Sequence, residues 1–97
     1  MRFEVKFVRG ACDDIAGYAA RERRLIMDGI AAYLEADADT ETRRRKRLRS
    51  NPLAPWELRM GIYRVFYEVR DKSVVRVLAV GHKEHNELYI RGRKAEI

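Results

Sequence analysis

Residues 56–80 alternate apolar and polar side chains in three short runs, and this pattern constrains the fold more than any other feature. The runs are WELRM, IYRVFYEV and SVVRVLAV, at 56–60, 62–69 and 73–80. Each is rich in β-branched and aromatic residues, which predicts three β-strands. Turn-forming residues separate them, with Gly61 in the first turn and Asp71-Lys72 in the second. Strands joined by such short turns pair in antiparallel fashion.

The N-terminal part of the chain indicates one strand and two helices. RFEVKFV at 2–8 alternates with period two and predicts a half-buried strand that ends at Gly10. Asp13 and Asp14 are typical of a helix N-terminus, so we expect a short helix over 12–19. A second helix is predicted over 20–36, because Ile26, Ile30, Tyr33 and Leu34 form one apolar stripe.

The order of these elements predicts an α+β fold, β-α-α-β-β-β. A curled antiparallel sheet of about four strands would carry both helices on one face. The segment 37–55 contains Pro52 and Pro55 and lacks apolar periodicity, so we expect a long loop with at most one helical turn. NELYI at 86–90 is a candidate for a further short strand. A chain of 97 residues is the size of one domain, which we expect to span 1–97.

Two-residue turns centred on Met60-Gly61 and Asp71-Lys72 would divide the last three strands into two faces. The predicted core face holds Trp56, Leu58, Met60, Tyr63, Val65, Tyr67, Val69, Val74, Leu78 and Val80, with Arg76 as an exception. The other face holds Glu57, Arg59, Ile62, Arg64, Phe66, Glu68, Val75, Val77 and Ala79. In this register Arg64 lies opposite Glu57. No segment is predicted to cover the second face, which suggests a partner. A turn of odd length would exchange the faces beyond it.

One heptapeptide accounts for the net charge of +6. Residues 1–42 carry a net charge of −3, RRRKRLR at 43–49 carries +6, and the remainder carries +3. The basic residues are Arg43, Arg44, Arg45, Lys46, Arg47 and Arg49. Clustered cations of this kind suit a polyphosphate such as RNA. A solvated linker is an open alternative, and an anionic membrane surface is a weaker one because no amphipathic apolar face accompanies the run.

Several classes of protein are excluded by what the sequence lacks. His82 and His85 are the only histidines, and no metal-binding or nucleotide-binding motif is present, so we expect neither metal nor cofactor. Cys12 is the single cysteine and lies beside two carboxylates, which disfavours a reactive thiolate. No apolar stretch is long enough to cross a membrane, and no signal segment opens the chain. We therefore expect a cytoplasmic protein.

The sequence from Lys46 to Tyr89 resembles the RelE/ParE superfamily of small bacterial toxins. The resemblance is carried by KRLRSNP (46–52), WELRMGIYRVFYEV (56–69) and VVRVLAVGHKEHNELYI (74–90). It implies a toxin of a type II toxin–antitoxin pair, silenced by an antitoxin protein that wraps it. RelE-like members cleave mRNA on the ribosome without metal, through attack of the 2′-hydroxyl on the phosphate. In such pairs the antitoxin also carries the complex to operator DNA.

The resemblance also implies roles for individual residues. Arg64 would stabilise the pentavalent phosphorane, Lys83 would bind the scissile phosphate, and Tyr89 would stack on or deprotonate the nucleotide. Pro55 and Glu57 replace two lysines of RelE, and Glu57 becomes a candidate general base. His82 and His85 are further candidate acid–base groups.

Two other functions remain open at this point. ParE-like members inhibit DNA gyrase and lack the ribonuclease residues, and the replacements at Pro55 and Glu57 fit that alternative. A catalytically weak relative that serves as a binding module is the other alternative. In either case Arg64, Lys83 and Tyr89 have ordinary structural roles, as an ion-pair partner, a loop cation and an edge aromatic.

Overall fold

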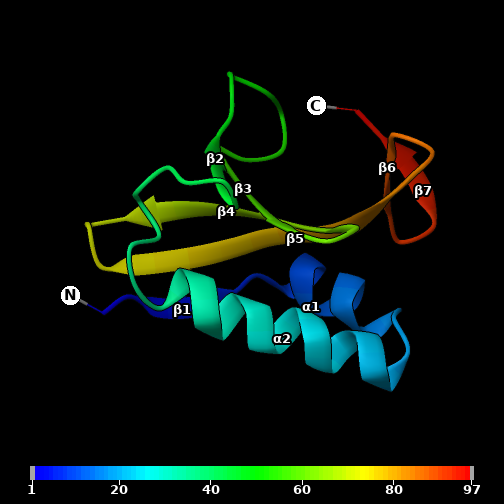
Figure 1. Cartoon of the computed structure of the whole chain (residues 1–97), viewed down its shortest axis with the longest axis horizontal. Helices are drawn as coiled ribbons and strands as arrows, with labels where there is room; N and C mark the ends of the chain where they lie inside the picture. The colour runs from blue at the N-terminus through cyan, green and yellow to red at the C-terminus, as the bar shows by residue number, and fades with distance from the viewer. Residues whose placement is uncertain (1, 97) are drawn as a thin grey trace.

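A computed structural model describes residues 2–96 of the chain as two helices and a seven-stranded sheet (Figure 1). The elements, in chain order, are β1 (Glu4–Phe7), α1 (Arg9–Ala16), α2 (Ala20–Leu34), β2 (Arg45–Arg47), β3 (Trp56–Met60), β4 (Tyr63–Arg70), β5 (Val74–Glu84), β6 (Glu87–Ile90) and β7 (Arg93–Ala95). The sheet order is β2-β3-β4-β5-β6-β7, and β1 pairs with β5 outside this path. The predicted α+β class and the order of the first elements are confirmed.

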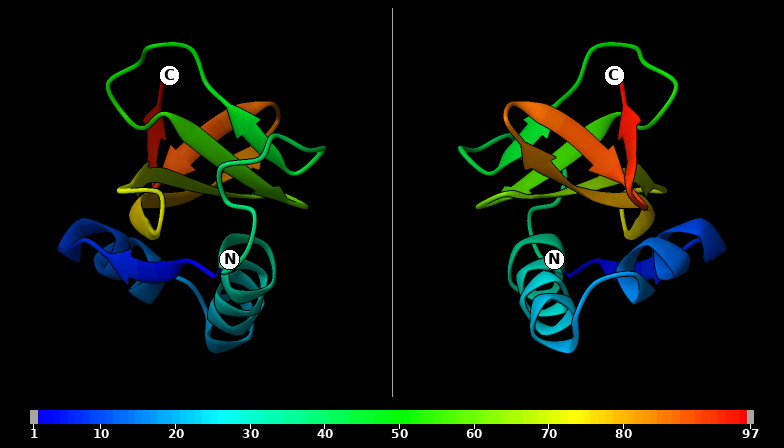
Figure 2. Two further views of the ribbon diagram at one scale, coloured as in Figure 1. Left: turned by 90° about the vertical axis from the view of Figure 1, so that its left-hand side faces the viewer. Right: turned by 90° about the vertical axis from the view of Figure 1, so that its right-hand side faces the viewer.

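Both helices lie on one face of the sheet, as the sequence predicts (Figure 2). Ile26, Ile30 and Leu34 of α2 are buried there, and Tyr33 is half-buried. The helix residues join one core with the apolar side of the sheet; its buried sheet members are Trp56, Leu58, Val65, Tyr67, Val75, Val77 and Val80. The predicted stripe of α2 is therefore its core contact.

The first helix begins earlier than the sequence pattern indicates. It spans Arg9–Ala16 rather than 12–19, and its N-cap Val8 makes no side-chain capping bond. Asp14 is not a capping residue, because its side chain is buried and its Oδ2 accepts a hydrogen bond from the backbone N–H of Val80 at 2.9 Å. Gly10 lies inside the helix and does not mark a turn.

The β3–β4 turn lies one residue beyond the predicted position, which changes the pairing register of the two strands by two residues. Met60 pairs with Tyr63, so Gly61 and Ile62 form the loop, and Gly61 adopts a positive φ of 59°. A shift of two residues moves no side chain to the other face. Both predicted faces of β3 and β4 are therefore preserved, but Glu57 lies opposite Phe66, and Arg64 lies opposite Arg59.

The β4–β5 turn has an odd length, which exchanges the predicted faces in the first part of β5. Arg70 pairs with Val74, so Ser73 belongs to the loop together with Asp71 and Lys72. Val75 and Val77 consequently enter the core, where Val74, Arg76 and Leu78 were expected. The register shifts again between Phe66 and Tyr67, which restores Val80 to the core face.

Two neighbours share the remaining edge of β5. The start of β5 pairs in parallel with β1, from Glu4 with Val74 to Phe7 with Val77. The end of β5 pairs in antiparallel fashion with β6. The strands β2 and β7 are not anticipated by the sequence pattern, because each has only three residues and carries mainly Arg and Lys.

The second face of the sheet is partly covered by the chain itself, contrary to the sequence-based expectation. Phe66 and Ala79 are buried there against Ala54 and Leu88. The covering segments are the loop 48–55 and the β6–β7 hairpin, which lie on the side of the sheet opposite the helices (Figure 2). Phe66 and Ala79, which the sequence analysis expects on an open face, are therefore covered.

Candidate functional site

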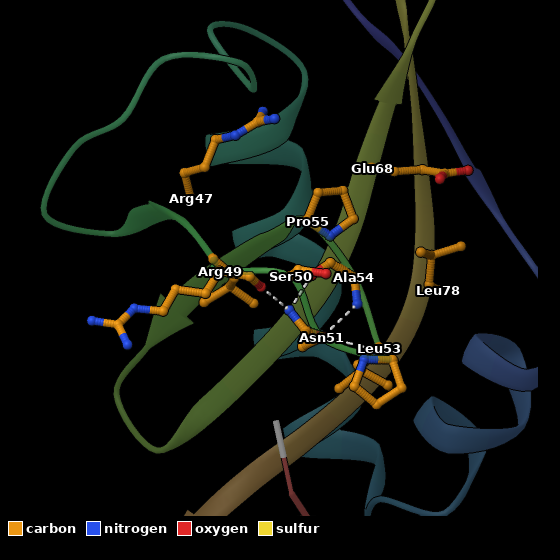
Figure 3. Close-up of a pocket in the computed structure, with 11 residues that line it drawn as sticks. Arg47, Arg49, Ser50, Asn51, Leu53, Ala54, Pro55, Glu68 and Leu78 are labelled. Carbon is orange, nitrogen blue, oxygen red and sulfur yellow. Dashed lines mark hydrogen bonds between the residues drawn. The ribbon is translucent and has the colours of Figure 1, made fainter.

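The loop 48–55 lies over the second face and is fastened by the side chain of Asn51 (Figure 3). Its Nδ2 donates to the carbonyl oxygens of Arg49 at 2.6 Å and Ala54 at 2.8 Å. Its Oδ1 accepts from the backbone N–H groups of Leu53 at 2.8 Å and Ala54 at 3.0 Å. One amide therefore satisfies four backbone groups and holds an irregular segment in one shape.

A cavity of about 360 Å³ lies beside this loop and collects several of the predicted site residues. It is lined by Leu48, Arg49, Ser50, Asn51, Glu57, Arg59 and Lys83. Three of these side chains are cationic and one is a carboxylate. The cavity is of a size that can hold one nucleotide-like group, and its charge favours an anion.

Glu57 is the buried anion of this cavity, with a relative exposure of 3%. Its Oε1 lies 2.7 Å from Nε of Arg59, and its Oε2 lies 3.9 Å from Nε of Arg64. A buried carboxylate requires such partners, because removal from water without them costs several kcal/mol. The predicted Arg64–Glu57 pair exists, but as a diagonal contact rather than across one pair of opposed residues.

Arg64 is held at the end of the β3–β4 turn. Its Nη1 donates to the carbonyl oxygens of Gly61 at 2.7 Å and Tyr63 at 3.0 Å. Burial lowers the pKa of Arg64 from its ordinary value, and Glu57 opposes this change. Its buried Nε has no hydrogen-bond acceptor within residues 2–96, so one donor of the guanidinium remains unused beside Glu57.

Lys83 and Tyr89 are not brought together. Lys83 pairs with Leu88 and lines the cavity, whereas Tyr89 pairs with His82 on the face that carries the helices. Tyr89 stacks on His82 with ring centroids 5.9 Å apart, and its hydroxyl donates to Glu87. The hydrogen bond to Glu87 and partial burial raise the pKa of Tyr89.

The two histidines also lie away from the cavity. His82 forms hydrogen bonds on the helix face with the hydroxyl of Tyr18 at 2.7 Å and with Glu84 at 2.8 Å. His85 occupies the β5–β6 turn with a positive φ of 51° and is exposed. Neither histidine lines the cavity, whose titratable side chains are the carboxylate of Glu57 and the cations Arg49, Arg59 and Lys83.

The basic run 43–49 is divided between structural and free cations. Arg45 is part of the fold, because its Nε donates to the Thr40 carbonyl at 2.9 Å and its Nη1 to the Tyr33 carbonyl at 3.0 Å. Arg44 and Arg47 lie over aromatic rings, at 4.8 Å from Tyr33 and 5.4 Å from Trp56.

Lys46 and Arg49 lie nearer to the cavity. Lys46 is directly opposite Glu57 in the β2–β3 register and so shares its face, and Arg49 lines the cavity. Arg43 is exposed. These three cations make no ion pair in the described chain, so they are available to a polyanion.

A second cavity, of about 490 Å³, lies on the other side of the loop (Figure 3). Arg47, Arg49, Glu68 and Leu78 line it together with the loop residues. It contains none of the residues predicted to act in chemistry, and Glu68 is already paired with Arg76 at 2.8 Å. The cavity beside Glu57 is therefore the better candidate site.

Arg59 is the site residue that the sequence analysis did not single out. It follows Glu57 by two positions in β3, so the two side chains share a face of the sheet. The sequence spacing alone could have indicated this ion pair, since opposite charges two residues apart on a strand lie next to each other on one face. Within residues 2–96 no group of three or more His, Cys, Asp or Glu side chains is arranged to hold a metal, and neither helix is long and apolar enough to span a membrane.

Comparison with known proteins identifies the family of the chain. The family described as "ParE toxin of type II toxin-antitoxin system, parDE" matches residues 8–87. Among solved structures, the RelBE2 toxin–antitoxin complex of Mycobacterium tuberculosis contains a similar chain, with a TM-score of 0.67 and 26% identity over 86% of this chain and 93% of that one. No curated protein matches the sequence. The chain therefore belongs to the ParE toxin family, within the RelE/ParE superfamily of type II toxin–antitoxin systems.

Proposed function

We propose that this toxin is a metal-independent endoribonuclease that cleaves mRNA on the ribosome and is held inactive by a cognate antitoxin. The observation that carries the proposal is the cavity beside the loop 48–55, in which Arg59 and Lys83 flank the buried carboxylate of Glu57. The antitoxin is supported by the similar chain, which occurs in a toxin–antitoxin complex.

The chemistry needs a base, an acid and charge neutralisation at one phosphate. Glu57 would accept the proton of the 2′-hydroxyl as its oxygen attacks the phosphorus. Lys83 would bind the phosphate and donate a proton to the departing 5′-oxygen, which leaves a 2′,3′-cyclic phosphate. Arg59 and Arg64 would neutralise the extra negative charge of the phosphorane. Tyr89 and His82 have no part in this scheme, because they lie on the other face.

The free cations extend this site along the RNA. Lys46 and Arg49 would contact flanking phosphates, and Arg43 would contact ribosomal RNA. Arg44, Arg45 and Arg47 would contribute to the local positive potential without direct contacts, because they are held by the fold.

The test is to add the folded toxin to a translating extract and map new mRNA 5′ ends. Lys83→Ala should abolish most cleavage, while Lys6→Ala, which removes an exposed cation from β1, should not. Intact mRNA with the folded wild-type protein would refute the ribonuclease proposal.

A second candidate function is inhibition of DNA gyrase without catalysis. It is favoured by the family match itself and by the ion pairs of Glu57, which occupy the carboxylate that a ribonuclease would use. A supercoiling assay with purified gyrase separates the two functions. Inhibition at stoichiometric toxin, together with intact mRNA, would support this candidate.

A further inference from the structure

The cavity of about 490 Å³ on the other side of the loop 48–55 contains none of the groups that carry out the proposed cleavage step. It nevertheless shares four lining residues with the cavity beside Glu57, and these are Leu48, Arg49, Ser50 and Asn51. The two cavities are therefore neighbours on either side of one loop. A chain of nucleotides with one phosphate beside Glu57 can place an adjacent nucleotide in the second cavity.

Glu68 is the carboxylate of this cavity, and two arginines hold it through one of its oxygens. Its Oε2 accepts hydrogen bonds from Nε of Arg70 at 2.9 Å and from Nη1 of Arg76 at 2.8 Å. Its Oε1 accepts no hydrogen bond from residues 2–96, and the side chain is 23% exposed. Because two donors fill the acceptor sites of Oε2, the cavity offers one fixed acceptor, Oε1, to a ligand.

A β-bulge supplies part of the apolar wall of the cavity. The register shift between Phe66 and Tyr67 leaves Leu78 without a partner on β4. Leu78 and Ala79 consequently both pack on the face that carries the loop, although they are consecutive in β5. Leu78 lines the cavity together with Leu53 of the loop (Figure 3). Apolar walls with a few fixed polar groups are typical of sites that bind a small planar group such as a nucleobase.

The cations of the cavity, Arg47 and Arg49, come from the loop side (Figure 3). Arg47 lies over the ring of Trp56 at 5.4 Å, whereas Arg49 is exposed and makes no ion pair with the described residues. Because Arg49 lines both cavities, its guanidinium can bind the phosphate that joins a nucleotide in one cavity to a nucleotide in the other. The cavity thus has a group for the phosphate, walls for the face of a base and an acceptor for its edge.

We propose that this cavity recognises the base of a nucleotide next to the cleaved phosphate, and that Oε1 of Glu68 selects adenine or cytosine by accepting a hydrogen bond from the exocyclic amino group. The inference rests on the proposed ribonuclease function and narrows the substrate of that function. Glu68 is a specificity-determining residue in this account and takes no part in the cleavage step.

The single free oxygen of Glu68 decides between the four bases. Adenine N6 and cytosine N4 are donors, whereas guanine O6 and uracil O4 occupy the corresponding ring position as acceptors and would face the carboxylate. Guanine needs both carboxylate oxygens to use its N1–H and N2 amino group together, and Oε2 is already filled by Arg70 and Arg76. The N3–H of uracil is flanked by two carbonyl oxygens, so a contact through it also brings an acceptor toward the carboxylate.

The first experiment measures binding of the four nucleoside 3′,5′-bisphosphates, each of which carries one base with a phosphate on either side. The methyl signals of Leu53 and Leu78 report occupation of the cavity by NMR. Saturable shifts are expected, with dissociation constants about tenfold lower for the adenosine and cytidine compounds than for the guanosine and uridine compounds. Equal binding of all four compounds, or shifts that do not saturate, would overturn the inference.

Glu68→Gln should reverse the preference rather than abolish binding. Arg70 and Arg76 both need an acceptor, so they hold the amide oxygen at the position of Oε2. The amide NH₂ then takes the place of Oε1 and donates to guanine O6 or uracil O4. Glu4→Gln, an equal change of charge at an exposed position of β1, should keep the wild-type preference. A folded Glu68→Gln protein with the wild-type preference would contradict the proposed contact, and the wild-type ratios decide the question if this variant does not fold.

The second experiment maps mRNA 5′ ends in a translating extract with the wild-type toxin and with Glu68→Gln. Wild-type cuts should be enriched in adenine or cytosine at one fixed position next to the cleaved bond, and the variant should shift that position to guanine or uracil. Cleavage without a base preference at that position, or with the same preference in both proteins, would refute the inference and leave the ribonuclease proposal standing. Selective binding of the bisphosphates without any cleavage would refute the ribonuclease proposal and retain the cavity as a base-binding site.

Discussion

Lys83 and Tyr89 point to opposite faces of the β5–β6 ribbon, although they are close in sequence. Lys83 is opposite Leu88 on the face with the loop 48–55, and Tyr89 is opposite His82 on the face with the helices. A ligand in one cavity cannot touch both side chains. This separation makes the two residues a matched pair for deciding which face carries the activity.

Lys83→Ala should reduce mRNA cleavage about 100-fold, the scale for loss of one preorganised donor at a transition state. Tyr89→Phe should leave the rate unchanged, because its hydroxyl donates to Glu87 and lies on the face away from the cavity. The rates are measured with folded variants by mapping 5′ ends in a translating extract. Loss of activity in Tyr89→Phe with retention in Lys83→Ala would assign the activity to the helix face.

Arg64→Ala should lose cleavage about 10²–10³-fold and should also be destabilised by about 1–3 kcal/mol. The stability loss follows because its Nη1 bonds to Gly61 and Tyr63 disappear and Glu57 keeps only Arg59 as a partner. Urea unfolding measures it. Adding Glu57→Gln should recover part of the lost stability, since the buried carboxylate that Arg64 helped to neutralise is then uncharged. Strictly additive effects of the two changes would contradict this ion-pair account.

Replacing Arg43, Lys46 and Arg49 together should weaken RNA binding and flatten its salt dependence. Each lost phosphate contact should reduce the slope of log K against log salt by about 0.7–0.9. Arg45→Ala should instead lower stability with little effect on the slope, because Arg45 is bonded to Thr40 and Tyr33. Filter binding at several salt concentrations provides the slopes. An unchanged slope in the triple variant would show that these cations do not contact phosphates and that the basic run 43–49 serves solubility instead.

Gly81→Ala should strongly destabilise the protein. A Cβ at this position would lie 2.4 Å from the backbone oxygen of Tyr89, where the sheet curls and β6 approaches closely. Gly17→Ala is the control, because its Cβ would meet the Asp14 carbonyl at an ordinary 3.4 Å. Thermal unfolding should show a large drop in Tm for the first variant and a small change for the second. Similar Tm values for the two variants would contradict the close approach of β6.

The stability of the protein should fall as pH rises from about 10 to about 12 because of Tyr18. Burial, reinforced by Glu22, raises the pKa of Tyr18 to about 12. The folded chain therefore keeps a proton that the unfolded chain releases near pH 10, so the stabilising contribution is present below pH 10 and is lost through this window. Urea unfolding between pH 9 and 11.5 should show a shallower decline for Tyr18→Phe. Parallel curves would exclude Tyr18 as the cause.

The sequence predicts the helices and the three long strands because their apolar periodicity is strong. It does not determine the register of β5, which depends on whether Ser73 belongs to the turn. The predicted core face carried Arg76 as an exception, and that charge was the visible sign of an odd-length turn. A bulge that later restores the register has no periodic signal, because it changes one residue only.

The candidate site could also be predicted only in part, because the face that each side chain occupies depends on the lengths of the turns. Glu57 and Arg64 are correctly placed on one face, because a register change of two residues between β3 and β4 preserves parity. Tyr89 could not be placed from sequence, since the face it occupies depends on the length of the β5–β6 turn. Asp14 shows the opposite limit, because a carboxylate near a helix start is typical of a cap and its burial against Val80 depends on tertiary packing.

The parallel pairing of β1 with β5 joins Glu4 to Val74 and Phe7 to Val77. The first strand is therefore without its partner until residues 74–77 have been synthesised, and both helices pack on the same sheet. Long-range pairing of this kind is slow to form and leaves apolar surface exposed during synthesis. The strand β1 and both helices of a nascent toxin consequently lack their sheet partners until β5 has been made, and the harmful form can arise only after β5 has left the exit tunnel.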